Sequence, residues 1–279
     1  MIITKDESKI CNLGLVFLEV EKDKLIIKTC CDAFYLTEIP LQDFFDSENV
    51  VDLIYNQIKD IQIKNKQLPG TYCIKKLKRC NFMINEKNNL KGLYISLLKS
   101  CNLNCKFCCA LSTRTNKYDD LYFKVLNKLT EKEYNLEIIN LTNKGEPFLY
   151  YDKTIDFLKK LNNNITKKIY VITNGINLNK ERIDELYNIS KEKNIKIEIQ
   201  VSLNAFNKDT YKNLMGQDYF DKVVENILYL KEKNLLILVS YVVVKENEKE
   251  VEDFENFFKK RNITTVTNIA EFLPENYYT

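Results

Sequence analysis

The sequence predicts an α/β fold, a partial (β/α)6 TIM-like barrel preceded by a small α+β domain that contains cysteines. Three observations lead to this prediction. Apolar segments of strand length alternate with segments of helix length from about residue 91 onward. Polar motifs follow four successive predicted strands. Residues 1–90 lack the alternation and hold five of the nine cysteines. We therefore expect one domain at 1–90 and the barrel at 91–279.

Six strands are predicted in the barrel region, namely GLYISLLKS, LEIINLT, KIYVIT, KIEIQVSLN, LLILVSYVVV and ITTVTNIA. The segments between them predict helices: DLYFKVLNKLTEK, DKTIDFLKKL, NKERIDELYNISKEK, FDKVVENILYLKEK and VEDFENFFKK. Strands that alternate with helices of this length are typical of βαβ units and a parallel sheet. A closed eight-unit barrel typically needs about 250 residues, so this region suits a partial barrel. An open doubly wound sheet is the alternative.

The fourth predicted strand favours the barrel. Its apolar positions are Ile195, Ile197, Ile199, Val201 and Leu203. They alternate with the polar residues Lys196, Glu198, Gln200, Ser202 and Asn204. A central strand of a doubly wound sheet is covered on both faces and is apolar throughout. With helices on the outside, the polar row is expected to line the interior of a barrel.

Composition narrows the possible chemistry. The chain has 279 residues, a net charge of +3 and no histidine, which excludes every site that needs an imidazole. Lysine and glutamate are interspersed rather than gathered in a basic block, so the sequence does not predict nucleic acid as a partner. We see no signal peptide, and the longest apolar run, LLILVSYVVV, is too short to cross a bilayer as a helix. We expect a cytoplasmic protein without a membrane partner, whose cysteines serve metal or redox chemistry.

Four cysteines crowd the segment SCNLNCKFCCAL, which follows the first barrel strand. A disulfide knot, a zinc site and an iron–sulfur cluster are the candidate explanations. Cys101, Cys105 and Cys108 are too close together in sequence to surround one zinc ion easily, and zinc would need a fourth ligand from elsewhere. A [4Fe–4S] cluster is larger and suits a loop wrapped around it. Three thiolates would leave one iron open for a substrate or cofactor.

Three further motifs follow the next three strands. Gly-Glu-Pro begins at Gly145, Thr-Asn-Gly at Thr173 and Ser-Leu-Asn at Ser202, at nearly equal intervals. The carboxyl ends of parallel strands meet at one edge, where α/β barrels build their active sites. The sequence therefore predicts that these motifs and the cysteine loop converge.

These motifs resemble those of the radical S-adenosylmethionine (AdoMet) superfamily over about residues 91–270. CNLNCKFC is similar to the family's Cys-x3-Cys-x-aromatic-Cys loop, and NKGEPF to its Gly-Glu-Pro motif, although Lys144 replaces the usual first glycine. The resemblance implies that Cys101, Cys105 and Cys108 hold a [4Fe–4S] cluster. It also implies a cofactor-binding set: Phe107, Gly145, Glu146, Pro147, Thr173, Asn174, Ser202 and Asn204.

The chemistry that the resemblance implies is reductive cleavage of AdoMet to a 5′-deoxyadenosyl radical, which abstracts hydrogen from a substrate. The protein would be a radical SAM oxidoreductase or maturase served by a flavodoxin- or ferredoxin-like electron donor. We expect a peptide or protein substrate; a sugar or RNA is the alternative among enzymes. The alternative from another class is a non-catalytic iron–sulfur or zinc module for electron transfer or interaction.

Residues 1–90 resemble the auxiliary-cluster module called SPASM, which usually follows the barrel. A first cysteine before a β-hairpin, a Cys-Cys pair, a helix and a closing cysteine group match it. The resemblance implies a second [4Fe–4S] cluster on Cys11, Cys30, Cys73 and Cys80, with Cys31 spare. The hairpin lacks the usual turn glycine, and the closing group has only two cysteines. A zinc site and free thiols are the alternatives.

Overall fold

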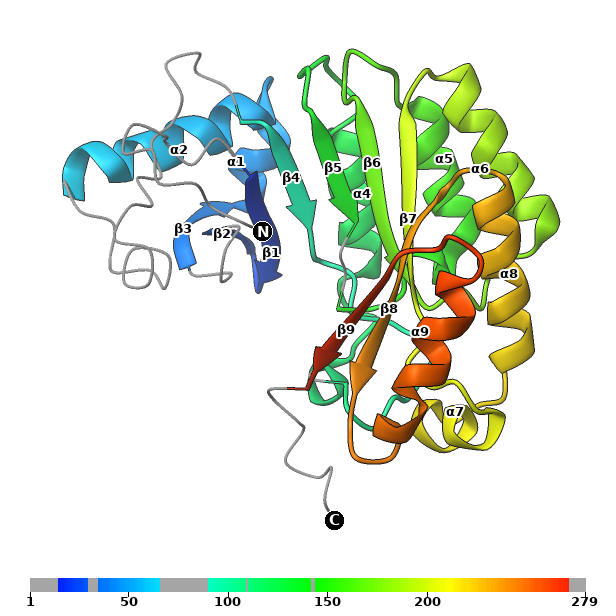
Figure 1. Cartoon of the computed structure of the whole chain (residues 1–279). Helices are drawn as coiled ribbons and strands as arrows, with labels where there is room; N and C mark the ends of the chain where they lie inside the picture. The colour runs from blue at the N-terminus through cyan, green and yellow to red at the C-terminus, as the bar shows by residue number, and fades with distance from the viewer. Residues whose placement is uncertain (1–14, 30–34, 66–89, 109, 142–143, 271–279) are drawn as a thin grey trace, which may run out of the picture.

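The computed structural model describes residues 15–29, 35–65, 90–108, 110–141 and 144–270 (Figure 1). In these residues the strands form one sheet of nine in the order β3-β2-β1-β4-β5-β6-β7-β8-β9. The strands are β1 Leu15–Glu21, β2 Lys24–Thr29, β3 Tyr35–Pro40, β4 Gly92–Ile95, β5 Ile138–Leu141, β6 Lys168–Thr173, β7 Lys196–Ser202, β8 Leu236–Val243 and β9 Thr265–Ile269.

The α-helices are α1 Leu41–Asp46, α2 Val50–Asn65, α4 Asp119–Lys128, α5 Tyr151–Lys160, α6 Lys180–Glu192, α7 Lys208–Met215, α8 Phe220–Glu232 and α9 Val251–Lys259. Short 3-10 turns lie at Leu111–Thr113, Pro147–Tyr150 and Glu248–Glu250. All strand pairs from β4 to β9 are parallel. The curved sheet is not closed, so the predicted α/β fold with a partial barrel is confirmed (Figure 1).

The helices that follow the barrel strands lie along one face of the sheet (Figure 1), and the strand side chains on that face are apolar and buried. Leu93, Ile139, Ile169 and Ile199 from four neighbouring strands are fully buried there. Burial of such side chains is the main favourable contribution to folding, at about 1.5–3 kcal/mol each. The helices that follow the strands are therefore packed on the outside, as the sequence predicts.

The opposite, inner face carries polar and aromatic side chains. Tyr94, Asn140 and Tyr170 lie in register across β4, β5 and β6, one position away from the buried row. On β7, Gln200 is half-buried, between the fully buried Ile199 and Val201. The alternation in the fourth predicted strand therefore separates the two faces, as expected.

The amino-terminal strands extend the barrel sheet. β1 and β2 form the predicted antiparallel hairpin, whose turn places Lys22 at φ 54° without a glycine. β1 then pairs in parallel with β4, the first barrel strand. The sheet is thus continuous on either side of residue 90, and the division into domains at 1–90 and 91–279 stays a prediction.

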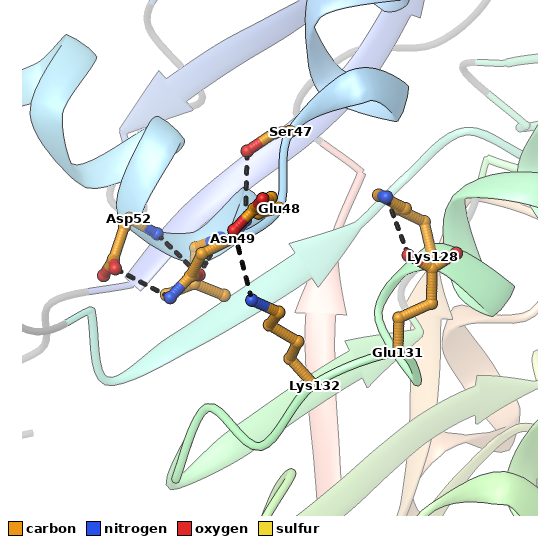
Figure 2. A network of polar contacts seen from close by, with 8 residues as sticks. Ser47, Glu48, Asn49, Asp52, Lys128, Glu131 and Lys132 are labelled. Atoms are coloured by element: carbon orange, nitrogen blue, oxygen red, sulfur yellow. Dashed lines mark hydrogen bonds and ion pairs between the residues drawn. The ribbon is translucent and has the colours of Figure 1, made fainter.

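Figure 2 shows how the start of α2 is capped and where it meets the barrel region. The side-chain oxygen of Asn49 accepts hydrogen bonds from the backbone N–H groups of Val51 (3.2 Å) and Asp52 (3.1 Å), as an N-cap residue does. Next to it, the Lys132 ammonium lies 3.9 Å from the Glu48 carboxylate. None of the helices in the described residues combines the length and apolar character required to cross a bilayer.

Candidate functional site

The cysteine loop leaves the carboxyl end of β4 and packs against the end of α7. The backbone N–H of Lys106 donates to the Leu214 carbonyl (3.0 Å), and that of Asn104 to the Met215 carbonyl (3.4 Å). The Cys105 Sγ lies 3.4 Å from the Met215 Sδ. The sequence analysis did not anticipate α7, although its cap Asn207 and the left-handed Gly216 that follows it are recognisable helix signals.

All three predicted cluster ligands are half-buried free thiols in this loop. Burial, with smaller contributions from Cys101 and Cys108, raises the pKa of Cys105 to about 12. Burial likewise raises the pKa of Cys101. The three sulfur atoms are therefore near enough to influence one another. Because a cysteine binds iron as its thiolate, a cluster held by this loop would displace protons from these thiols.

Three free thiols in one loop have the donor chemistry that an iron–sulfur cluster requires. Among the described residues, no three His, Cys, Asp or Glu side chains are grouped so that they could hold one metal ion. A zinc site requires its ligands to converge on one centre. Thiolates around a [4Fe–4S] cluster bind different iron atoms, so they need not converge. Cys101, Cys105 and Cys108 would hold such a cluster.

Gly145 brings the Gly-Glu-Pro segment into direct backbone contact with the cysteine loop. Its N–H donates to the Leu98 carbonyl (2.9 Å), and the next N–H, of Glu146, donates to the Ser100 carbonyl (2.8 Å). A Cβ at Gly145 would lie 2.2 Å from the Ser100 oxygen. Only glycine permits this approach, which fixes the distance between the two motifs.

The Glu146 carboxylate links the ends of β5 and β6. One oxygen accepts from the Phe148 N–H (2.9 Å) and the Thr173 hydroxyl (2.6 Å). The other accepts from the Asn174 N–H (2.7 Å). Burial raises the pKa of Glu146, and these three hydrogen bonds oppose that rise. Glu146 therefore organises the edge internally, and its contact with AdoMet stays a prediction.

Asn174 joins the cysteine loop to β6. Its side-chain N–H donates to the Asn102 side-chain oxygen (2.8 Å), while its own oxygen accepts from the Ile176 N–H (3.0 Å). Asn102, between the first two cluster cysteines, also accepts at its backbone carbonyl from Gln217 (3.0 Å). The sequence analysis missed Asn102, since asparagine is ordinary in a loop.

Ser202 and Asn204 lie at the end of β7 but have different surroundings. The Ser202 hydroxyl is 3.2 Å from that of Ser240 on β8, on the inner face. The Asn204 side-chain oxygen accepts from the Val242 N–H (2.8 Å), and its backbone carbonyl accepts from Asn247 (2.9 Å). Asn204 thus clamps β7 to β8, whereas Ser202 stays half-buried at the inner face.

The two remaining predicted residues are packed. Phe107 is a buried member of the hydrophobic core, so its aromatic ring anchors the cysteine loop. Pro147 is buried at the first position of a 3-10 turn, where its missing N–H costs nothing. The structure therefore brings the cysteine loop, Gly-Glu-Pro, Thr-Asn-Gly and Ser-Leu-Asn together at one edge of the sheet.

Asp119 is a functional candidate that the sequence analysis missed. It is buried at the start of α4 and accepts hydrogen bonds from the hydroxyls of Ser100 (2.6 Å) and Tyr150 (2.6 Å). Ser100 directly precedes Cys101, so the hydrogen bond from Ser100 to this carboxylate fixes the start of the cysteine loop. The Asp-Asp pair before a helical pattern suggests only an ordinary acidic first turn.

The predicted auxiliary ligands Cys11, Cys30, Cys73 and Cys80, with Cys31, lie outside the described residues.

Comparison with known proteins gives a match between residues 95–258 and the family model described as the Radical SAM superfamily. An uncharacterized protein, MJ0804, of Methanocaldococcus jannaschii is 29% identical over 160 residues, which are 56% of this chain and 49% of that protein. The GTP 3',8-cyclase of Aquifex aeolicus is 32% identical over 189 residues, 63% of this chain and 55% of the cyclase. The chain thus spans about half the length of these curated relatives.

Among solved structures, native anSMEcpe with bound AdoMet aligns with a TM-score of 0.49 and 18% identity, covering 67% of this chain and 55% of that one. The family match begins at residue 95 and does not include the amino-terminal cysteines. The SPASM-like module therefore stays a prediction.

Proposed function

The chain belongs to the radical SAM superfamily, and from this premise we propose that it cleaves AdoMet reductively and uses the resulting radical to remove hydrogen from a substrate. The observation that carries the proposal is the convergence of three half-buried thiols with the Glu146–Thr173–Asn174 network at one edge of the sheet. A flavodoxin- or ferredoxin-like protein is the electron donor that this chemistry needs.

Cys101, Cys105 and Cys108 would hold the cluster, and the rest of the edge would position AdoMet. When bound and reduced, the cluster supplies the electron that cleaves AdoMet to methionine and a 5′-deoxyadenosyl radical. Glu146 fixes the ends of β5 and β6 through its three hydrogen bonds. Asn174 holds the cysteine loop against β6. Ser202 offers a hydroxyl on the inner face. The packed outer face excludes water from behind the site.

For the substrate, we propose a nucleotide ahead of the peptide or protein that the sequence analysis favours. The peptide expectation depends on the SPASM-like resemblance, which the family match does not cover. Several relatives carry this name: the protein of Aquifex aeolicus is named GTP 3',8-cyclase, and that of Sulfolobus acidocaldarius probable GTP 3',8-cyclase. These names support a nucleotide class. GTP is therefore the first substrate to test.

Anaerobic reconstitution followed by reduction with dithionite in the presence of AdoMet tests the proposed chemistry. The wild-type protein should show broad visible absorption and release 5′-deoxyadenosine, measured by liquid chromatography. Cys105→Ala should abolish that release, while Ser112→Ala, at an exposed position just after the cysteines, should retain it. A colourless protein that binds zinc and leaves AdoMet intact would favour the non-catalytic alternative. Release by Cys105→Ala would refute the assigned ligand.

Iron counting addresses the auxiliary cluster independently. One [4Fe–4S] cluster gives about four irons per chain and two give about eight. If the amino-terminal cysteines hold the second cluster, Cys11→Ala should lower the iron content by about half and leave AdoMet cleavage without substrate intact. An unchanged content would contradict the auxiliary assignment.

A further inference from the structure

Lys144 is the residue at which this chain departs from the family's Gly-Gly-Glu-Pro pattern. Its ammonium lies 3.3 Å from the Oε2 atom of Glu19 on β1. Lys28 on β2 reaches the same oxygen at 2.8 Å. Two cations therefore share one carboxylate oxygen, and this charged triad, Glu19 with Lys28 and Lys144, carries one surplus positive charge.

The triad lies on the inner face near the carboxyl edge of the sheet. On β1, Glu19 alternates with the buried Leu18 and Val20 and so shares a face with Phe17, whose ring stacks on Tyr94 at 4.4 Å. Because the Ser96 N–H donates to the Leu18 carbonyl, Glu19 lies level with the end of β4. Lys144 enters the triad from the segment that leads directly into Glu146.

The two lysines are not equivalent partners. The side chain of Lys28 is 22% exposed and makes the shorter contact, whereas that of Lys144 is 41% exposed. Burial raises the pKa of Glu19, but the Lys28 hydrogen bond and the Lys144 charge outweigh it, so the pKa is lowered overall. Glu19 is therefore ionised at neutral pH and is neutralised chiefly by Lys28. Lys144 supplies the unbalanced charge.

We propose that Lys144 binds an anionic group of the substrate, of the phosphate class, at the mouth of the barrel, and that Glu19 competes with that group for the ammonium. This inference deepens the proposed function and rests on it, because a nucleoside triphosphate presents such a group. The Lys144 side chain is itself exposed and makes the longer of the two contacts with Glu19, so its ammonium can exchange the shared carboxylate oxygen for a phosphate oxygen at little cost. A glycine at this position could not offer the charge.

Removing the charge of Lys144 and removing the charge of Glu19 should change the affinity for the anion in opposite directions. In calorimetric titrations of the reconstituted, unreduced enzyme with GTP and with inorganic triphosphate, Lys144→Met should weaken binding about tenfold. Glu19→Gln should strengthen binding by about threefold, because it removes the competing carboxylate. Lys144→Arg should retain affinity. Added salt should weaken wild-type binding more than that of Lys144→Met.

Lys180 and Glu225, an exposed pair 3.1 Å apart on α6 and α8, provide the matched control. Lys180→Met and Glu225→Gln should leave all affinities unchanged. If Lys144 and Glu19 serve only to tie β1 to the barrel, both variants should lower the urea midpoint and leave binding unmoved, which overturns the proposal. If the wild type binds neither GTP nor inorganic triphosphate, the proposal is also overturned. Release of 5′-deoxyadenosine without substrate is measured separately. A loss of that release would contradict the proposed AdoMet cleavage, whereas unchanged anion affinities in the Lys144 and Glu19 variants would contradict only the role proposed for Lys144.

Discussion

The two faces of the barrel sheet are built from the same strands but hold together in different ways. On the outer face, fully buried side chains such as Leu93, Ile139 and Ile199 pack against helices. On the inner face, hydrogen bonds connect neighbouring strands. Tyr170 donates to Gln200, and Gln200 donates to Ser240 (2.9 Å). Stability therefore depends mainly on one face, which leaves the other free to carry chemistry.

Gly145→Ala should have the largest effect, because it tests the contact between the Gly-Glu-Pro segment and the cysteine loop at the carboxyl edge of the sheet. Because the new methyl group would overlap the Ser100 carbonyl, we expect a loss of about 3 kcal/mol in the free energy of unfolding and poor iron incorporation. Urea unfolding and iron content measure these effects.

Gly216→Ala is the control for that change. Gly216 has φ 78°, but a Cβ there would meet nothing closer than 3.8 Å. The control should cost only about 1 kcal/mol, from backbone strain alone. Equal losses in both variants would show that the contact with Ser100 is unimportant.

A direct comparison of the faces uses neighbouring residues on β7. Ile199→Ala leaves a cavity in the outer layer and should cost about 3 kcal/mol. Gln200→Ala removes hydrogen bonds from a half-buried inner position and should cost about 1 kcal/mol. Chemical denaturation of both variants measures the difference. A larger loss for Gln200→Ala would reverse the assignment of the faces.

Glu198 provides a pH-dependent test of the inner face. Burial raises its pKa, but hydrogen bonds from Lys196 and Lys168 outweigh this, so the pKa lies below the ordinary value of 4.5. The ionised form therefore stabilises the fold above pH 4.5, and that contribution is lost as the pH falls through the lowered pKa. Glu198→Gln should cost about 1.5 kcal/mol at pH 7 and progressively less below pH 4.5.

Thermal unfolding of the wild type and Glu198→Gln across this pH range checks the expectation, with Glu225→Gln as an exposed control. If the stability difference between the wild type and Glu198→Gln stays constant as the pH falls below 4.5, the ion pairs around Glu198 contribute nothing to the stability of the fold.

The smallest effect is expected at Lys132, outside both faces. Its ion pair with Glu48 spans 3.9 Å, and the two side chains are 47% and 94% exposed (Figure 2). Lys132→Ala should change the free energy of unfolding by less than about 0.5 kcal/mol, because exposed pairs gain little. A loss above about 1 kcal/mol would show that α2 is held to the barrel region chiefly by charge.

Local patterns in the sequence predict much of this architecture. KIYVIT coincides with β6, and the alternation in KIEIQVSLN correctly separates the outer Ile199 from the inner Gln200. The convergence of the four motifs follows because parallel strands share a direction. These features depend on spacing along the chain, which the sequence displays directly.

Other features depend on contacts between distant segments, which no local pattern specifies. The pairing of β1 with β4 is one example. The use of Asn204 to clamp β8 is another, since its motif position suggests a cofactor contact. The ion pair of Lys144 with Glu19 gives a reason for an unusual residue that the sequence alone presents only as a departure.

The pairing of Leu15 with Gly92 has a consequence for how the protein forms. β1 cannot complete its hydrogen bonds until β4, which is synthesised much later, has left the ribosome. Such a distant pairing raises contact order and slows assembly of the sheet. The mouth of the barrel, where Glu19 meets Lys144, should therefore be among the last parts of the protein to take shape.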